Sequence, residues 1–134
     1  MTPGGTKGLV VAGWTNVVGV LVVSRFFTHP YVGSLFPELF SPWGLASIVL
    51  WGLAYLSVSR SYAAVPGLLA VFALEKAFYA GSWMWWQAQG GARWPDIWAA
   101  DPLTAIFYAA YGPVDLAFGL FFAGLFLGLR RRPG

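Results

Sequence analysis

The sequence contains no cysteine and a single histidine, His29. The lack of cysteine excludes disulfide bonds, thiolate nucleophiles and cysteine-ligated metals. One histidine cannot by itself supply a multi-histidine metal or haem site. We therefore expect no metal site, and the sequence identifies no cofactor.

Charged residues are also scarce: they make up 10% of the 134 residues, whereas hydrophobic residues make up 58%. A soluble domain carries about 25% charged residues, because its surface must face water. The net charge is +3, and three of the eight basic residues lie together at 130–132, directly after an apolar run. This placement is typical of contact with anionic lipid headgroups. We therefore expect an integral membrane protein whose partners include membrane lipids and not nucleic acid.

Four apolar segments are each about long enough to cross roughly 30 Å of hydrocarbon. Prolines and glycines mark several of their ends, with Pro42 and Pro102 at first helical positions and Pro30 after the first segment. Pro113 should bend the last segment. The sequence thus predicts an all-α fold, a single domain over residues 1–134 and a polytopic bundle of four transmembrane helices, at about 8–27, 42–59, 63–87 and 101–129.

The basic residues predict the orientation of these spans. Lys7, Arg60 and the terminal arginines fall on one side, and Arg25 and Arg93 fall on the other. The side richer in basic residues is normally cytoplasmic, so both termini are expected inside. The two longer loops, 28–41 and 88–100, then face outward and are rich in aromatic residues. His29, in the first of them, is expected to be an ordinary interfacial residue.

Ionisable residues at membrane depth are the most informative feature of the sequence. Glu75 and Lys76 lie near the middle of the third span, and Asp115 lies near the middle of the fourth. At 1.5 Å per residue, the two carboxylates are expected at nearly the same depth. A charge at the bilayer centre costs at least about 2.5–3.5 kcal/mol, so such groups face the bundle interior and find partners. Lys76 should therefore pair with Glu75 or with Asp115.

Polar and aromatic residues recur at helical spacing around these charges. Glu75, Tyr79 and Ser82 share a face of the third span, and Tyr108, Tyr111 and Asp115 share a face of the fourth. Both faces run from mid-membrane toward the outer side, which predicts a polar pocket that opens outward. Asn16, in the first span, is expected somewhat closer to the inner side, where an interhelical hydrogen bond is the alternative interpretation. The candidate ligand-binding residues are Asn16, Glu75, Lys76, Tyr79, Tyr108, Tyr111 and Asp115, while the catalytic residues remain unknown.

Two short motifs carry a resemblance to known proteins. Leu-Glu-Lys-Ala-Phe-Tyr at 74–79 and Tyr-Gly-Pro-Val-Asp-Leu-Ala-Phe-Gly at 111–119 resemble small bacterial four-helix membrane proteins of the DoxX-like and BphX-like type. The resemblance implies a four-helix bundle in the bacterial inner (cytoplasmic) membrane. A looser likeness is to the sterol-isomerase-type four-helix fold, whose acidic residues project into a lipophilic pocket. This sequence lacks the histidine at membrane depth that such a site would use.

Three classes of function remain open. The first is a structural or accessory subunit of a larger membrane complex, which fits the small size and the aromatic outer loops; a homo-oligomer is the other possible assembly. The second is a protein that binds a lipophilic or cationic ligand in the outward-facing pocket. The third is a membrane enzyme doing isomerase-like acid–base chemistry on a lipid-like substrate with Glu75 or Asp115. We expect one of the first two.

Overall fold

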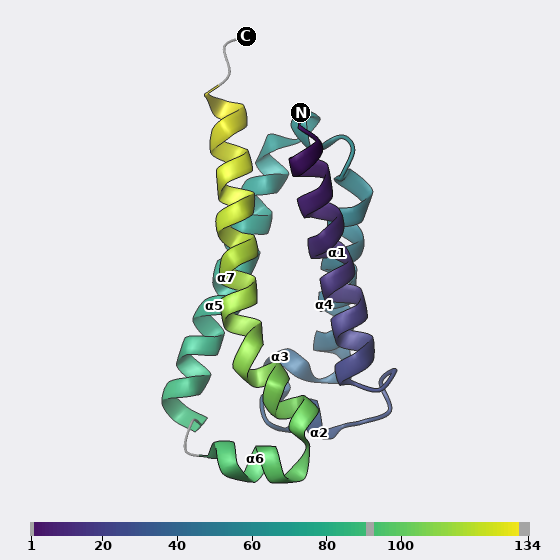
Figure 1. The fold of residues 1–134 in the computed structure, drawn as a ribbon, viewed down its shortest axis with the longest axis vertical. Coiled ribbons are helices and arrows are strands. Elements are labelled where there is room, and N and C mark those ends of the chain that lie inside the picture. Colours follow the sequence, from purple (N-terminus) through teal and green to yellow (C-terminus); the bar gives the residue numbers. More distant parts are fainter. Residues whose placement is uncertain (1, 91–92, 132–134) are drawn as a thin grey trace. The chain divides into compact units, whose positions relative to one another are not determined.

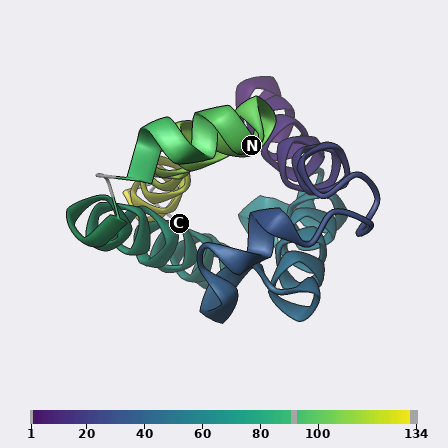
Figure 2. The same cartoon turned by 90° about the horizontal axis from the view of Figure 1, so that it is seen from below.

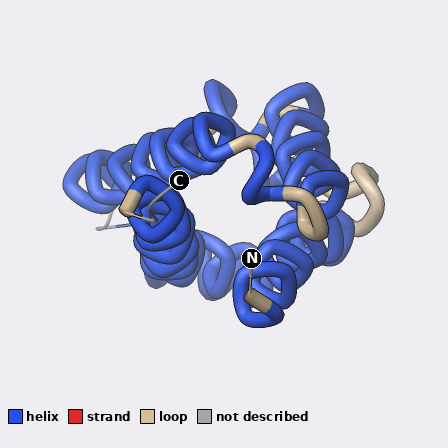
Figure 3. The backbone as a smooth tube through the Cα atoms, turned by 90° about the horizontal axis from the view of Figure 1, so that it is seen from above, coloured by secondary structure: helices blue, strands red, loops and turns tan. Residues whose placement is uncertain are grey.

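The computed structural model describes residues 2–90 and 93–131, and nearly all of them are helical. Figure 3 shows helices joined by short loops, with no strand in the described ranges. The segments 28–41 and 88–100, expected as outer loops, contain short helices in their described residues. Figure 1 labels the helices, whose bounds are α1 Pro3–Val23, α2 Tyr31–Ser34, α3 Pro37–Phe40, α4 Pro42–Val58, α5 Pro66–Gly90, α6 Trp94–Ala100 and α7 Pro102–Arg130, with a 3-10 turn at Tyr62–Ala64.

The chain divides into two compact units. One is Thr6–Arg60, which holds most of α1 together with α2, α3 and α4. The other is Ser61–Gly134 with the first residues, Met1–Gly5. Two features predicted from the sequence lie partly outside the described residues: residues 91–92 of the second long loop, and Arg132 of the arginine cluster.

Close backbone approach brings α1 and α4 together in the first unit, where the two helices lie side by side (Figure 1). A Cβ atom on Gly13 would lie 2.8 Å from the carbonyl oxygen of Gly52, and one on Gly52 would lie 2.7 Å from that of Gly13. Only glycine fits at such a crossing, because any side chain would meet backbone rather than a movable neighbour. One turn further along α1, the Asn16 side chain donates a hydrogen bond to the Ile48 carbonyl at 3.1 Å.

The first helix begins and ends earlier than expected, at Pro3–Val23 rather than about 8–27. It begins early because Pro3 suits a first helical position, and the Thr2 hydroxyl accepts a hydrogen bond from the Gly5 N–H at 3.1 Å. It ends early because Arg25, Phe26 and Phe27 all have positive φ, at 48°, 57° and 66°. These left-handed conformations cannot continue a right-handed helix.

The antiparallel pair α5 and α7 forms the core of the second unit. The Phe72 and Phe122 rings pack 5.5 Å apart toward one end of the pair. Toward the other end, a Cβ atom on Gly112 would lie 2.1 Å from the Trp83 indole, so this glycine allows the ring to lie against the α7 backbone. The short helix α6 runs crosswise to both and contacts α7, and its Ile97 is buried (Figures 1 and 2).

The ends of the remaining long helices agree closely with the sequence. Helix α4 covers Pro42–Val58, and the Ser41 hydroxyl caps it by accepting from the Gly44 N–H at 3.2 Å. Helix α5 covers Pro66–Gly90 rather than about 63–87, so it starts and ends three residues later; a 3-10 turn precedes its start. Asp101 is the N-cap residue of α7, as expected, although its carboxylate accepts from the Thr104 hydroxyl rather than from a backbone N–H.

Two helices in the described part of the chain, α1 and α7, are long and apolar enough to cross a membrane. The expected bundle of four spans is therefore not supported by length and composition. At 17 residues, α4 is shorter than the other long helices. Helix α5 has 25 residues, but Glu75, Lys76 and its polar C-terminal turns lower its hydropathy.

Candidate functional site

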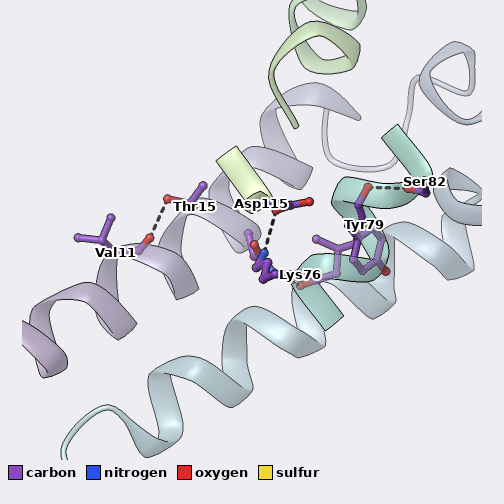
Figure 4. Close-up of polar contacts among 8 residues, drawn as sticks. Val11, Thr15, Lys76, Tyr79, Ser82 and Asp115 are labelled. Atoms are coloured by element: carbon purple, nitrogen blue, oxygen red, sulfur yellow. Dashed lines mark hydrogen bonds and ion pairs between the residues drawn. The ribbon is translucent and has the colours of Figure 1, made fainter. Parts of the chain in front are cut away.

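An ion pair joins the middles of α5 and α7. Lys76 Nζ donates to Asp115 Oδ1 at 3.0 Å, as Figure 4 shows. The Lys76 side chain is 2% exposed and that of Asp115 is 15% exposed, so the lysine is almost completely buried. Lys76 Nζ also lies 5.8 Å from the centre of the Phe118 ring, within range of a cation–π interaction. Of the two carboxylates that the sequence offered, Asp115 thus contacts the lysine directly.

The close approach of the two helices allows this contact. Gly119 lies one turn after Asp115 on α7, and a Cβ atom there would lie 3.1 Å from Lys76 Cβ. The lysine stem therefore passes over a position with no side chain of its own. A short separation of the helix axes lets the ammonium group reach the carboxylate.

A second polar contact lies one to two turns toward the C-terminal end of α5. The Ser82 hydroxyl is 3.2 Å from the Tyr111 hydroxyl and 2.7 Å from the Tyr79 carbonyl oxygen. Figure 4 shows Tyr79 and Ser82 on the same helix as Lys76, with Tyr79 the nearer of the two to the Lys76–Asp115 pair. Both tyrosines are buried. The structure thus brings Lys76, Asp115, Tyr79 and Tyr111 into one polar layer between α5 and α7.

The carbonyl group of Tyr108 accepts two side-chain hydrogen bonds from α5. The Trp83 indole N–H donates at 2.7 Å, and the Gln87 amide donates at 3.0 Å. This carbonyl lies near the turn that Pro113 disturbs, and proline inside a helix removes one backbone hydrogen bond and bends the axis. Helix α7 bends in its green N-terminal part in Figure 1. Side-chain donors from α5 thus stabilise the loosened part of α7.

Aromatic packing continues this contact toward α6. The Trp86 and Tyr108 rings lie 4.7 Å apart, and the Arg93 guanidinium lies 6.0 Å from the Trp86 ring. The Trp94 indole N–H donates to the Gln87 side chain at 3.1 Å, which ties α6 to α5. Tyr108, expected to line a polar pocket, is fully buried in this packing.

The remaining candidates lie apart from this layer or are buried beside it. Glu75 is 8% exposed, next to Lys76 on α5. Asn16 belongs to the other unit, where it makes the interhelical hydrogen bond to Ile48 that the alternative interpretation predicted.

The sequence interpretation missed Trp83, Gln87 and Gly112. The sequence did contain a pattern that could have identified two of them. Lys76, Trp83 and Gln87 recur at helical spacing on the face of α5 next to that of Glu75, Tyr79 and Ser82.

A cavity of about 250 Å³ is found in the other unit, around His29 at the ends of α1 and α4. Its walls are mostly apolar side chains. The sequence did not predict this cavity, because the residues that form it are brought together by the left-handed turn after α1.

The chemistry available in the α5–α7 layer is limited by these contacts. Within the described residues, no group of three or more histidine, cysteine or acidic side chains could hold a metal ion. The lysine and the aspartate contact each other, and the Tyr111 hydroxyl contacts Ser82. Comparisons with protein-family models, curated proteins and solved structures give no match, so the resemblance to DoxX-like proteins stays a prediction.

Proposed function

We propose that this chain is a multi-span membrane protein in which α4 and α5 cross the bilayer as well as α1 and α7. The observation that supports this is the reversed amphipathicity of α5. Its charged residue Lys76 is buried against α7, whereas Leu74 and Phe78 on its outer face are 71% and 61% exposed. A face of this kind suits hydrocarbon rather than water. Glu75 and Lys76 lower the mean hydropathy of α5, although neither side chain lies on its outer face.

The other helices fit the same environment. Only 11% of the apolar window of α7 is buried within the chain, far less than the core helix of a soluble protein would bury. Helix α4 rises about 25 Å over its 17 residues, at the short end of the range for a span. Trp43, at its start, is 86% exposed, in keeping with an aromatic residue at the membrane interface. The inner bacterial membrane, with both termini cytoplasmic, is the proposed location.

Single cysteines test this topology cleanly, because the chain has none. Ser34, Ser61 and Asp96 are exposed residues between successive long helices. With four spans, a membrane-impermeant thiol reagent should label Ser61→Cys from one side and Ser34→Cys and Asp96→Cys from the other. If α1 and α7 alone cross, all three positions lie on the same side and label together. The second result would overturn the proposal of four spans.

The function that the α5–α7 layer supports best is that of a non-catalytic accessory subunit of a membrane complex. The supporting observation is that the ionisable pair at membrane depth is satisfied within the chain, since Lys76 contacts Asp115 at 3.0 Å. A buried pair of this kind fixes the register of two helices. The outer faces of the two helices are apolar and can contact lipid or a partner helix; Leu120 on α7, for example, is 67% exposed.

Isolation of the protein from its native membrane in mild detergent tests this role. We expect the chain to elute with other polypeptides in a fixed stoichiometry. In Lys76→Met, the yield of the complex should fall in proportion to the yield of folded chain. Val11→Ala, on the exposed face of α1, is the matched control and should leave both yields unchanged. Recovery of the chain alone, or only as copies of itself, would contradict the accessory role.

Acid–base catalysis on a lipid-like substrate, and binding of a cationic ligand, receive less support from this geometry. Either activity would need Asp115 to leave Lys76, or Glu75 to act alone. The lysine already neutralises the aspartate that a cation or a substrate proton would use. Turnover that disappears in Asp115→Asn while the fold persists would favour the enzyme instead.

A further inference from the structure

The cavity near His29 has the size and walls of a small-molecule site. Its volume is about 250 Å³, and its lining includes Phe27, Pro30, Val32, Phe40 and Leu45. A dry cavity of about 150 Å³ lined by aliphatic and aromatic side chains is large enough for benzene. The cavity can therefore hold one substituted ring or a small fused pair of rings. It is too small for most drug-sized ligands, which occupy about 300–1,000 Å³.

The polar groups of the lining narrow the chemistry further. None of the twelve described residues that line the cavity is Asp, Glu, Lys or Arg, so nothing there compensates a charged ligand. The Ser24 and Ser34 hydroxyls donate to the Val20 and Tyr31 carbonyls at 2.6 and 2.7 Å, so their protons are already used.

His29 is the lining residue that carries ring nitrogens. Its Nε2 atom is buried. A neutral imidazole has one donor and one acceptor nitrogen, so it suits either a hydroxyl or a carbonyl group.

A strained turn after α1 positions some of the residues that line the cavity. Phe27 is the last of three consecutive residues with positive φ, none of which is glycine. Ser24 holds this turn, because its side-chain oxygen accepts from the Phe27 N–H and its carbonyl accepts from the His29 N–H, both at 3.0 Å. Such conformations persist only where the surroundings over-determine them, and they cluster at ligand sites. The turn places Phe27 and His29 in the lining of the same cavity.

We propose that this cavity binds a small neutral ring compound that carries one hydroxyl or carbonyl group, with His29 as its hydrogen-bonding partner. Such a compound partitions into membranes and would reach the cavity from the lipid. The proposal is independent of the accessory role, because it concerns the other unit of the chain and none of the residues of the α5–α7 layer.

Nuclear magnetic resonance of the full chain in lipid nanodiscs tests the proposal, with isotope-labelled histidine as the probe. Because the sequence has a single histidine, its side-chain signals report on this cavity alone. We expect naphthol to shift these signals saturably, and naphthalene, which lacks the hydroxyl, to bind about tenfold more weakly. A shift that grows linearly with naphthol, as simple partitioning into lipid would produce, overturns the proposal. Equal binding of naphthalene overturns the role of His29.

Cavity-filling variants locate the binding. Val32→Phe should weaken naphthol binding at least about tenfold, because the larger ring occupies the space that the ligand needs. Ser34→Phe narrows the same cavity from an exposed position, so it serves if Val32→Phe does not fold. Val11→Phe, at a position 56% exposed on α1, is the matched control and should bind as the parent does. Unchanged binding in a folded cavity-filling variant would contradict the assignment.

Discussion

The Lys76 ammonium and the Asp115 carboxylate lie 3.0 Å apart, although 39 positions separate them in the chain. Each is costly to bury alone, and the attraction between the two charges offsets part of that cost. The contact fixes which faces of α5 and α7 meet, and Gly112 and Gly119 allow the two helices to approach closely enough for it to form.

Removal of one member of the pair should destabilise the chain more than removal of both. Lys76→Met leaves Asp115 buried without its ammonium partner, at a cost of up to about 3 kcal/mol, the low end for buried pairs because the carboxylate is partly exposed. The double variant Lys76→Met/Asp115→Leu should recover most of this loss. Unfolding of each variant in mixed micelles of increasing denaturing detergent measures the coupling. Strictly additive effects would argue against the pair.

Gly112→Ala should destabilise the α5–α7 pair, because its Cβ atom would lie 2.1 Å from the Trp83 ring. Overpacking of this kind costs about 1–3 kcal/mol. Gly124→Ala, in the same helix, is the matched control, since a Cβ atom there meets nothing within 4 Å. The control should be neutral, or stabilising by up to about 1 kcal/mol through helix propensity. The same unfolding measurement compares them, and equal effects would refute the close approach at Gly112.

Trp83→Phe keeps most of the ring but removes the indole N–H that donates to the Tyr108 carbonyl at 2.7 Å. We expect a loss of about 1 kcal/mol in the free energy of unfolding. Amide hydrogen exchange should also accelerate around Pro113, where this bond supports the loosened turn. Trp43→Phe, at an exposed position, controls for the change of residue type. Unchanged exchange in Trp83→Phe would mean that the bond does not support the turn.

Gly13→Ala tests the crossing of α1 and α4 in the other unit. Its Cβ atom would lie 2.8 Å from the Gly52 carbonyl oxygen, and backbone cannot move aside as a side chain can. We expect destabilisation of about 1–3 kcal/mol, as for other overpacked contacts. Gly19→Ala on the same helix meets nothing within 4 Å and should leave unfolding unchanged or slightly improved. Similar behaviour of the two variants would exclude this crossing point.

Several features of the fold could be predicted because they depend on local chemistry. Pro42 and Pro102 mark the starts of α4 and α7, since proline is tolerated at a first helical position and not further in. Ionisable residues in apolar stretches are normally buried and paired, so the positions of Lys76 and Asp115 within such stretches predicted that they would find partners. The early end of α1 was not predicted, because nothing in Arg25 to Phe27 is typical of left-handed backbone.

The sequence by itself determined that the chain is helical, strongly apolar and poor in chemistry-bearing groups, because residue type and helical period are local properties. Only the tertiary structure decided that Asp115 contacts Lys76, that Tyr108 is held through its carbonyl, and that a cavity forms beside His29. Helical periodicity indicates which residues share a face, but not how far one helix is rotated or shifted against another. Those two quantities depend on side-chain packing, which in α5 and α7 is set by where Gly112 and Gly119 let the helices meet.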